Sequence, residues 1–289
     1  MTPRHAVRID AHQHFWDPKR FHYPWMEDAA LDPVRRPFSP DDLGPELAAR
    51  GIDGTVLVQT VSDLTETRMF LDIARETPFV HGVVGWVDLT APDVGDVLDQ
   101  LRDEYGQLLV GIRHQVHDEA DACWLERPNV RRGLGEIAAR DLAYDLLVRT
   151  RELPAAVSTV AALPGLRFVL DHIAKPRIAD SWDGPWATAL APLADLPNVD
   201  VKLSGMVTEA DWKDWSPQTL RPFIDHVLDL FTVQRVMFGS DWPVCLLAAD
   251  HYGVVADALA NAVNTLSATE KEQVFGLNAQ RSYRLPGLY

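Results

Sequence analysis

Eight short runs rich in valine, isoleucine and leucine alternate along the chain with longer amphipathic segments, and few folds accommodate that alternation. Runs of this kind predict strands of a parallel sheet, and the segments between them predict crossover helices. The third run is the least regular, because Gly82 and Gly85 interrupt it. The runs occupy residues 6–12, 54–60, 79–89, 108–116, 142–149, 166–172, 199–205 and 235–243.

Signals for the ends of helices occur between these runs. Residues 65–78 carry apolar side chains at helical spacing, and residues 216–231 begin with Ser216 as a cap and Pro217 in the first turn. Gly51 has the position of a glycine that ends a helix. Eight parallel strands with crossover helices close most naturally into an α/β fold of the (β/α)8 TIM barrel class. We therefore predict a single domain over residues 1–289.

Composition limits the classes of partner and location. Apolar residues make up 47% of the chain, which is sufficient for a large core, and the net charge is −15. That charge disfavours nucleic acid and anionic membrane as partners, so a small-molecule substrate is expected. We find neither a signal segment nor an apolar run long enough to cross a membrane, and Cys123 and Cys245 are too few for a disulfide framework. These observations predict a cytoplasmic protein, and a homo-oligomer is left open.

One long segment lacks the alternation. Residues 15–40 contain Tyr23, Trp25 and several prolines with little periodicity. Loops at the mouth of a barrel commonly contact substrate. We predict that this segment is a loop over the active site.

Polar side chains fall where the predicted strands end, and in a barrel enzyme those ends carry the chemistry. A polar group that closes a buried strand is costly unless it is paired. The register of the strands that contain Asp145 and Lys202 cannot be fixed, so the directions of these two side chains stay open. The polar residues at strand ends are His12, His14, Arg113, His114, His172, Ser204 and Asp241.

The first of these groups is a histidine pair, His12 and His14, separated by one residue. Side chains two positions apart in a strand share a face, so both imidazoles can converge on one point. Such a pair suits a divalent metal, and it equally suits two hydrogen-bond donors to one substrate oxygen. A pair of purely structural histidines is the alternative.

Five motifs together resemble the amidohydrolase superfamily. They are IDAHQHFWDP, GIRHQVHDE, VLDHIAKP, VKLSGM and VMFGSDWPVC, in that order along the chain. The resemblance runs from Ile9 to about Asn278 and is most specific for a lactonase branch, which includes L-fuconolactonase and 2-pyrone-4,6-dicarboxylate lactonase. It indicates the superfamily and the branch without identifying the substrate.

The resemblance implies roles for four residues. His12 and His14 match the histidine pair of the first strand, His172 matches a histidine of a later strand, and Asp241 matches the aspartate that ends the last strand. In the superfamily these groups hold a divalent metal. In the lactonase branch they can also surround the substrate carbonyl without a tightly held metal, and Asp241 is then the catalytic base.

The sequence departs from the superfamily members that bind two metals. A second metal needs a bridging Lys or Glu and a further histidine at strand ends, whereas the corresponding runs here offer Asp145 and Lys202 or Ser204. A binuclear centre is therefore not expected. His12, His14, His172 and Asp241 could complete the shell of one Zn²⁺ that is weakly held or dispensable.

Further residues are candidates for substrate binding. Arg113 suits recognition of a carboxylate or of neighbouring oxygens, although it could instead pair with a carboxylate at the rim of the barrel. The aromatic side chains of Tyr23 and Trp25 could stack on a sugar-like ring, and Trp86 and Trp242 could do so or could pack in the core. The candidates for substrate binding are Arg113, His114, Lys175, Tyr23, Trp25 and Ser204.

These observations predict an enzyme that hydrolyses a sugar-acid lactone, such as L-fucono- or L-rhamnonolactone, with Asp241 as the general base. A pyrone dicarboxylate brings two negative charges, which a chain of net charge −15 disfavours. The alternatives are a dicarboxylate lactonase, a metal-dependent decarboxylase of an aromatic or muconate-like acid, and a non-catalytic sugar-acid binding protein.

Overall fold

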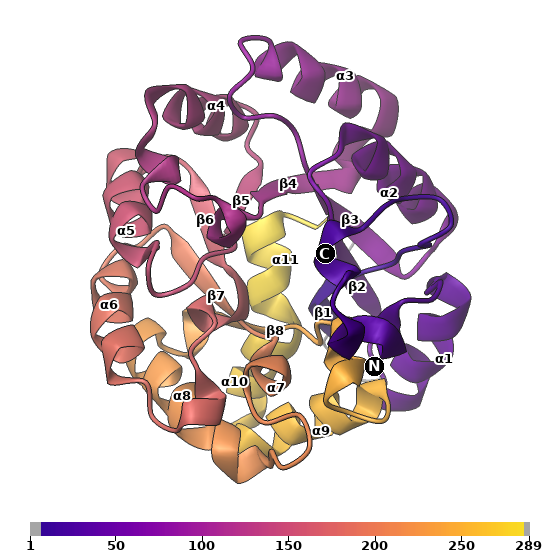
Figure 1. Ribbon diagram of the computed structural model, residues 1–289, viewed down its shortest axis with the longest axis vertical. Helices are drawn as coiled ribbons and strands as arrows, with labels where there is room; N and C mark the ends of the chain where they lie inside the picture. Colours follow the sequence, from indigo (N-terminus) through magenta and orange to yellow (C-terminus); the bar gives the residue numbers. More distant parts are fainter. Residues whose placement is uncertain (1–6, 286–289) are drawn as a thin grey trace, which may run out of the picture.

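The computed structural model describes residues 7–285, and its strands and helices alternate along the chain (Figure 1). All eight strands belong to one sheet in the order β1 to β8, and each neighbouring pair is parallel. Residue 6, where the first predicted run begins, lies outside the described part. The strands are β1 (Ile9–Gln13), β2 (Gly54–Val58), β3 (Val80–Gly85), β4 (Leu109–His114), β5 (Ala143–Leu146), β6 (Arg167–Leu170), β7 (Val199–Leu203) and β8 (Val236–Phe238).

Hydrogen bonds between β1 and the segment after β8 close the sheet. The backbone N–H of Asp241 donates to the carbonyl of His12 at 2.8 Å, and that of His14 donates to the carbonyl of Trp242 at 2.7 Å. The sheet is therefore a barrel, and the predicted (β/α)8 fold is confirmed. The bonds that close the barrel also place two predicted parts of the active site side by side. These are the histidine pair at the end of β1 and the aspartate that follows β8.

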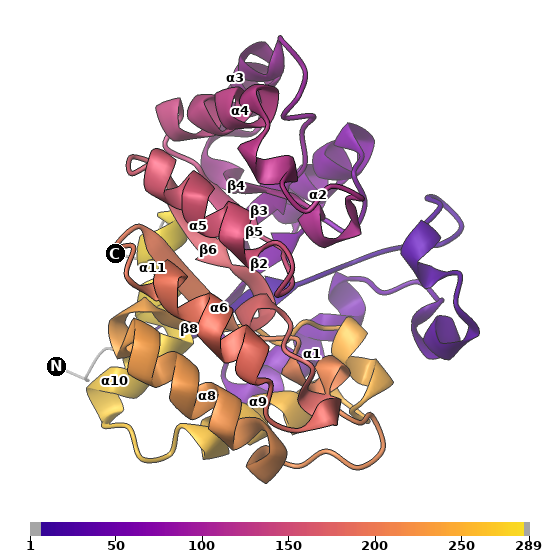
Figure 2. The same cartoon turned by 60° about the vertical axis from the view of Figure 1, so that its left-hand side comes forward.

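Helices surround the barrel (Figures 1 and 2). The predicted cap is present, since α8 follows Ser216 with a capping box, and Gly51 ends α1 at a φ of 60°. None of the helices in residues 7–285 is long and apolar enough to cross a membrane. The α-helices are α1 (Pro40–Arg50), α2 (Leu64–Glu76), α3 (Val94–Tyr105), α4 (Pro128–Ala139), α5 (Leu153–Ala162), α6 (Gly184–Ala194), α7 (Met206–Glu209), α8 (Pro217–Phe231), α9 (Tyr252–Ala262), α10 (Ala268–Glu272) and α11 (Asn278–Tyr283).

The core has two parts. A large apolar layer lies between the strands and the surrounding helices, and a smaller cluster joins strand residues such as Val56 and Val169 to Tyr283 and Leu285 near the C-terminus. This second cluster explains a glycine in β3, because a Cβ on Gly82 would lie 2.7 Å from the side chain of Val110. The irregular third run is thus a strand whose glycine makes room for close packing.

The segment after β1 projects from the barrel as a separate lobe (Figure 2). It contains two short 3-10 helices, η1 (Pro24–Met26) and η2 (Ala29–Val34), rather than a structureless loop. Paired backbone hydrogen bonds between Trp16 and Phe38 hold its base together, and α1 begins at Pro40. Trp25 of this lobe lines the cavity described below.

Candidate active site

His12 in β1 and His14 directly after it face the barrel interior because the strand is irregular. Its register against β2 slips by one residue between Asp10 and Gln13. Before the slip, Asp10 points toward the surrounding helices and accepts a 3.2 Å hydrogen bond from the hydroxyl of Tyr252 in α9. After it, His12 and His14 lie on the same inward face, with their Nε2 atoms 3.2 Å apart.

A strained turn places His172. Directly after β6 the chain forms η6 (Asp171–Ala174), and the residues from His172 to Lys175 have φ values between 48° and 62°. Left-handed conformations at residues other than glycine cost about 1–3 kcal/mol each and persist where the surroundings enforce them. One such restraint is a 2.9 Å hydrogen bond between His172 Nδ1 and Ser204 Oγ.

Gly205 leaves room for the imidazole of His172. A Cβ at position 205 would lie 2.4 Å from His172 Nδ1, and its φ of 60° also favours glycine. We expect Gly205→Ala to displace the ring and to lower kcat/KM for the substrate by about tenfold or more, because displacements of about 1 Å can cost up to 10²-fold. Gly135→Ala, where a Cβ would meet nothing within 4 Å, is the control for steady-state assays. Equal activity of both variants would contradict this role of Gly205.

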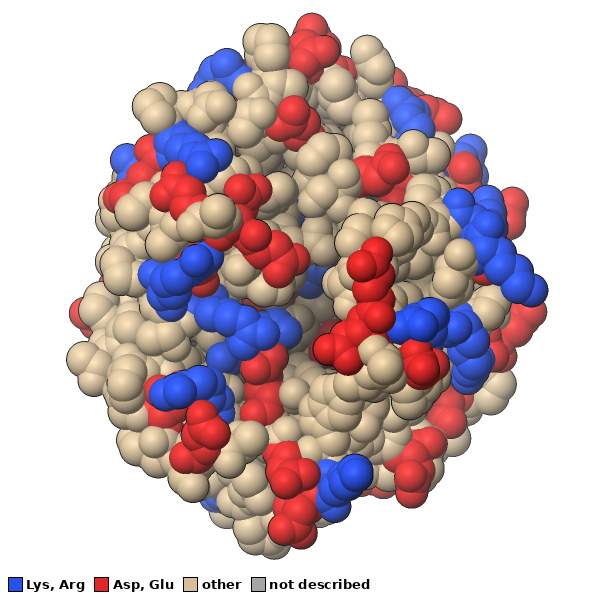
Figure 3. All heavy atoms as spheres, in the orientation of Figure 1, with Lys and Arg blue, Asp and Glu red and all other residues tan. Residues whose placement is uncertain are grey.

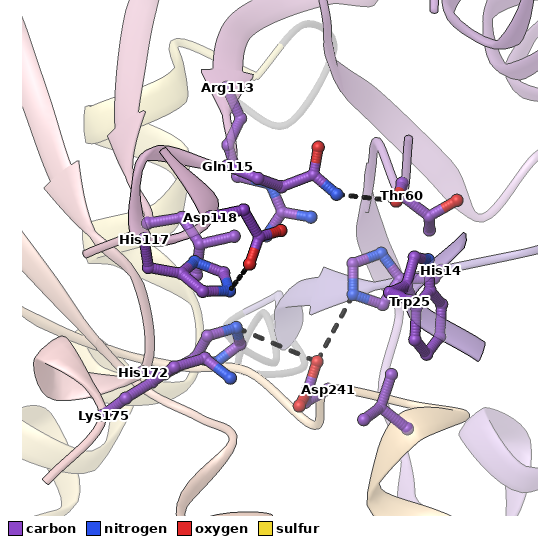
Figure 4. A pocket seen from close by; sticks show the side chains of 12 residues that line it. His14, Trp25, Thr60, Arg113, Gln115, His117, Asp118, His172, Lys175 and Asp241 are labelled. Carbon is purple, nitrogen blue, oxygen red and sulfur yellow. Dashed lines mark hydrogen bonds and ion pairs between the residues drawn. The ribbon is translucent and has the colours of Figure 1, made fainter. Parts of the chain in front are cut away.

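Asp241 is the point on which the three histidines converge, and Figure 4 shows two of them, His14 and His172, directed toward its carboxylate. It follows β8 with a φ of 57°. Its Oδ1 lies 3.3 Å from His14 Nε2 and 3.7 Å from His12 Nε2. His172 Nε2 lies 4.0 Å from the same oxygen. Residues from both ends of the sequence therefore form one compact group.

The donors of this group fit one divalent ion. His14 Nδ1–H donates to the carbonyl of Val58 at 2.7 Å, so its Nε2 presents a lone pair to the lone pairs of Asp241 Oδ1. Acceptors that face each other need a cation or a proton between them. Ligands at about 2.1 Å from a tetrahedral ion lie about 3.4 Å apart, and the spacings within His12, His14 and Asp241 are 3.2, 3.3 and 3.7 Å.

A second candidate group shares His12 but is already occupied by protein cations. The ligand atoms of His12, Asp171 and His172 also lie within 4.8 Å of one another. However, Asp171 Oδ1 forms an ion pair with Lys202 Nζ at 2.9 Å, and Asp171 Oδ2 accepts a hydrogen bond from Arg113 Nη1 at 2.9 Å. These two positive charges disfavour a further ion beside Asp171, so the geometry favours one metal over two.

The direction of Lys202, which the sequence left open, is inward. Its ammonium is fully buried and lies 2.6 Å from Asp145 Oδ2, 2.9 Å from Asp171 Oδ1 and 3.1 Å from His12 Nδ1. Tyr283 of α11 donates from its hydroxyl to the carboxylate of Asp145. A buried ionic network therefore supports His12 from beneath.

Protonation states follow from burial. Burial lowers the pKa of His12, His14 and His172, so the three imidazoles are neutral at neutral pH. Burial by itself raises the pKa of Asp241, but the surrounding polar and charged groups outweigh burial and leave this pKa below its ordinary value. The site therefore combines neutral nitrogen donors with an ionised carboxylate, the states that metal binding and base catalysis both require.

A cavity of about 160 Å³ that opens to solvent lies above this group. Figure 3 shows the molecule hollowed near the centre of the face that carries the mouth of the barrel. The cavity is lined by His14, Trp25, Thr60, Arg113, Gln115, His117, Asp118, Leu147, His172, Lys175, Asp241 and Val244.

Three of the six residues predicted to bind substrate line this cavity, namely Trp25, Lys175 and Arg113. Lys175 pairs with Glu209 at 3.1 Å. Arg113 is only 3% exposed and lies deeper than a residue of the rim. Its Nη1 also lies 3.3 Å from His12 Nε2, and its Nη2 donates to the carbonyl of Gln59. Arg113 is therefore held mainly by protein groups.

The other three residues lie elsewhere. Tyr23 is buried within the lobe, and Ser204 contacts His172 from behind. His114 stacks on Trp124 with ring centroids 4.2 Å apart and is hydrogen-bonded to Trp86 and Glu119. Trp242 is buried against Phe15 and Phe38, as its core alternative predicted. None of these three candidates is among the residues that line the cavity.

Sequence reasoning missed part of the cavity wall. Gln115, His117 and Asp118 follow β4 and point into the cavity (Figure 4). Thr60 does so after β2. Their positions in the sequence could have identified them, since each residue lies close to the end of a predicted strand, where residues of the active site are expected.

Comparisons with known proteins agree with this geometry. A sequence model described as amidohydrolase matches residues 9–285. The chain is 39% identical over 291 residues to an L-fucono-1,5-lactonase of Burkholderia multivorans, with 97% of each chain covered. It is 41% identical over 287 residues to an L-fucono-1,5-lactonase of Burkholderia ambifaria, with 97% of this chain and 96% of that protein covered.

A solved structure shares the whole architecture. It is an amidohydrolase from Burkholderia multivorans with bound zinc, 39% identical to this chain, and the two superpose with a TM-score of 0.92. The match covers 97% of this chain and 100% of the solved one. The similarity therefore extends over the barrel and its loops together.

Proposed function

This chain belongs to the amidohydrolase family, and on that premise we propose that it hydrolyses an uncharged lactone of a sugar acid, such as L-fucono- or L-rhamnonolactone. The observation that carries the proposal is the convergence of His12, His14 and His172 on Asp241 at the floor of the cavity. Three neutral imidazoles beside an ionised carboxylate form an ester-hydrolysing arrangement.

Asp241 performs the proton transfers in this proposal. Its carboxylate takes a proton from a water molecule as that water attacks the lactone carbonyl carbon. The acyl–oxygen bond of the ring then breaks, Asp241 returns the proton to the departing ring oxygen, and an aldonate with a free hydroxyl is released. The imidazoles of His12 and His172 lie near the position where negative charge develops on the carbonyl oxygen, whereas His14 Nε2, which carries a lone pair, is suited to hold a cation.

His12, His14 and Asp241 form a group that would hold one divalent ion, with His172 Nε2 4.0 Å from Asp241 Oδ1 as a further donor, and zinc suits nitrogen and carboxylate donors. When bound, such an ion supplies Lewis acidity toward the carbonyl oxygen. Support for zinc comes from the spacing of the donors and from the zinc-bound relative of 39% identity. How tightly the ion is held, and whether turnover requires it, are left to experiment.

The charges of the cavity favour a neutral substrate. Arg113 pairs with Asp171 and Lys175 pairs with Glu209, so both cations that line the cavity already have carboxylate partners. Asp118 adds a negative charge to the wall. A pyrone dicarboxylate would have to displace these partners or remain unpaired, which is costly in a buried site.

The test is a panel of aldonolactones and pyrone dicarboxylate lactones, assayed at neutral pH by acid release. We expect kcat/KM to favour the aldonolactones by more than tenfold, since the two cations among the described residues that line the cavity are already paired with carboxylates. Assays with added zinc and with a chelator show whether the metal is needed. The reverse preference would identify the chain as a dicarboxylate lactonase, and release of CO₂ from an aromatic acid would identify it as a decarboxylase.

Binding of a lactone without any acid release would identify a sugar-acid binding protein instead.

The cytoplasmic location and a homo-oligomeric state stay predictions from the sequence. Cell fractionation and sedimentation of the purified protein would test them.

A further inference from the structure

The segment after β4 builds a wall of the cavity that the ring-opening chemistry does not use. It forms the short 3-10 helix η4 (Val116–Asp118). Gln115 is fully engaged, because its amide donates to the carbonyl of Thr60 and its oxygen accepts from Ser62, both at 2.9 Å. Asp118 is different, since its side chain lines the cavity and is 61% exposed.

His117 orients the carboxylate of Asp118. The backbone N–H of His117 donates to the carbonyl of Leu147, and its ring is largely buried. Burial and the nearby positive charges of Lys175, Arg149 and Arg113 lower the pKa of His117 to about 3, so the ring is neutral. Its Nε2 lies 3.3 Å from Asp118 Oδ1, close enough for a ring protonated at Nε2 to donate to this oxygen.

The result is an oriented acceptor that faces the cavity (Figure 4). Only one oxygen of Asp118 is near His117, which leaves the other oxygen and the remaining lone pairs available to a ligand. Hydroxyl groups donate to carboxylates in short, charge-assisted hydrogen bonds, whereas a carboxylate on the ligand would be repelled. The wall therefore suits a ligand rich in hydroxyls and without negative charge.

We infer that Asp118, held in place by His117, is a specificity-determining residue that accepts hydrogen bonds from neighbouring hydroxyls of the lactone substrate. The inference rests on the proposed function and deepens it, because it assigns the recognition of hydroxyls to one wall of the cavity. His117 acts through Asp118 and is a positioning residue. The ring-opening group around Asp241 is separate from both.

Two lactones of the same ring size test this role. L-fucono-1,5-lactone carries ring hydroxyls, and δ-valerolactone has the same ester without them. For Asp118→Ala we expect the ratio of kcat/KM between these lactones to fall by about tenfold or more, because the hydroxylated substrate alone loses charge-assisted hydrogen bonds. Spontaneous hydrolysis is measured without protein and subtracted.

The matched control is Asp121→Asn, on the same loop. Asp121 pairs with Arg127 at 2.9 Å and is not among the residues that line the cavity, so the ratio should stay at the wild-type value. His117→Phe should raise KM for the hydroxylated lactone more than it lowers kcat. Rescue by His117→Gln, whose amide can still donate, would support a positioning role.

The outcomes separate this inference from the proposed function. If wild type hydrolyses L-fucono-1,5-lactone and Asp118→Ala keeps the wild-type ratio, the role of Asp118 is wrong while the lactonase function stands. Equal losses on both lactones would also overturn it, since they would show an effect on the common ester chemistry. If wild type hydrolyses neither lactone, the proposed function fails and this inference fails with it.

Discussion

Replacing Asp241 with asparagine should lower lactone turnover by about 10²–10⁴-fold, the effect typical of a lost acid–base group. Asparagine preserves the shape of the side chain, and the backbone N–H that donates to the carbonyl of His12 is retained. The barrel should therefore stay closed. Steady-state kinetics with the best aldonolactone measure the loss, and circular dichroism verifies the fold.

A control separates this effect from a general change of charge. Asp195 is exposed at the end of α6, and Asp195→Asn should retain wild-type turnover. Zinc content of purified Asp241→Asn distinguishes the two roles of the carboxylate, because loss of metal in proportion to turnover would indicate a ligand and not a base. Near wild-type turnover would refute the general-base assignment.

The fold was predictable because periodicity and length decide it. Eight apolar runs separated by helical segments admit few closed arrangements, and Ser216 and Gly51 mark helix ends with residues whose chemistry is specific to those places. The lobe was predicted less well. Its 3-10 helices depend on contacts of Trp16, whose indole donates to carbonyls of Val34 and Arg36, and such contacts have no periodic signature.

The catalytic group was predictable in composition but not in geometry. His12, His14, His172 and Asp241 each end a strand, and the ends of barrel strands meet at one face. Nothing in the sequence announces the register slip in β1. The left-handed turn from His172 to Lys175 contains no glycine, so it also leaves no local signal. In the slipped strand and in the turn, contacts with the rest of the barrel override the conformational preference of the residues. Both features lie next to the catalytic group.

The direction of the Lys202 side chain also could not be predicted from the sequence. Register decides whether a strand residue points into or out of a barrel, and a shift by one residue reverses the answer. In the structure its ammonium lies between two carboxylates that are themselves fully buried, Asp145 and Asp171. Burial raises the pKa of Asp171, but Lys202, His12 and Arg113 more than compensate, and Asp171 is ionised at neutral pH.

Lys202→Met should consequently lower the free energy of unfolding by about 3–5 kcal/mol, because it leaves buried negative charge without its partner. Urea unfolding at neutral pH measures the loss. The double variant Lys202→Met with Asp145→Leu should recover part of this lost stability, since it also removes one of the two carboxylates left without a partner.

Lys175→Met is the control. Lys175 also pairs with a carboxylate, that of Glu209 at 3.1 Å, but both side chains are partly exposed to solvent, so a loss of about 1 kcal/mol in the free energy of unfolding is expected. Equal effects of Lys202→Met and Lys175→Met would show that the buried network contributes no more to the free energy of unfolding than a partly exposed ion pair does.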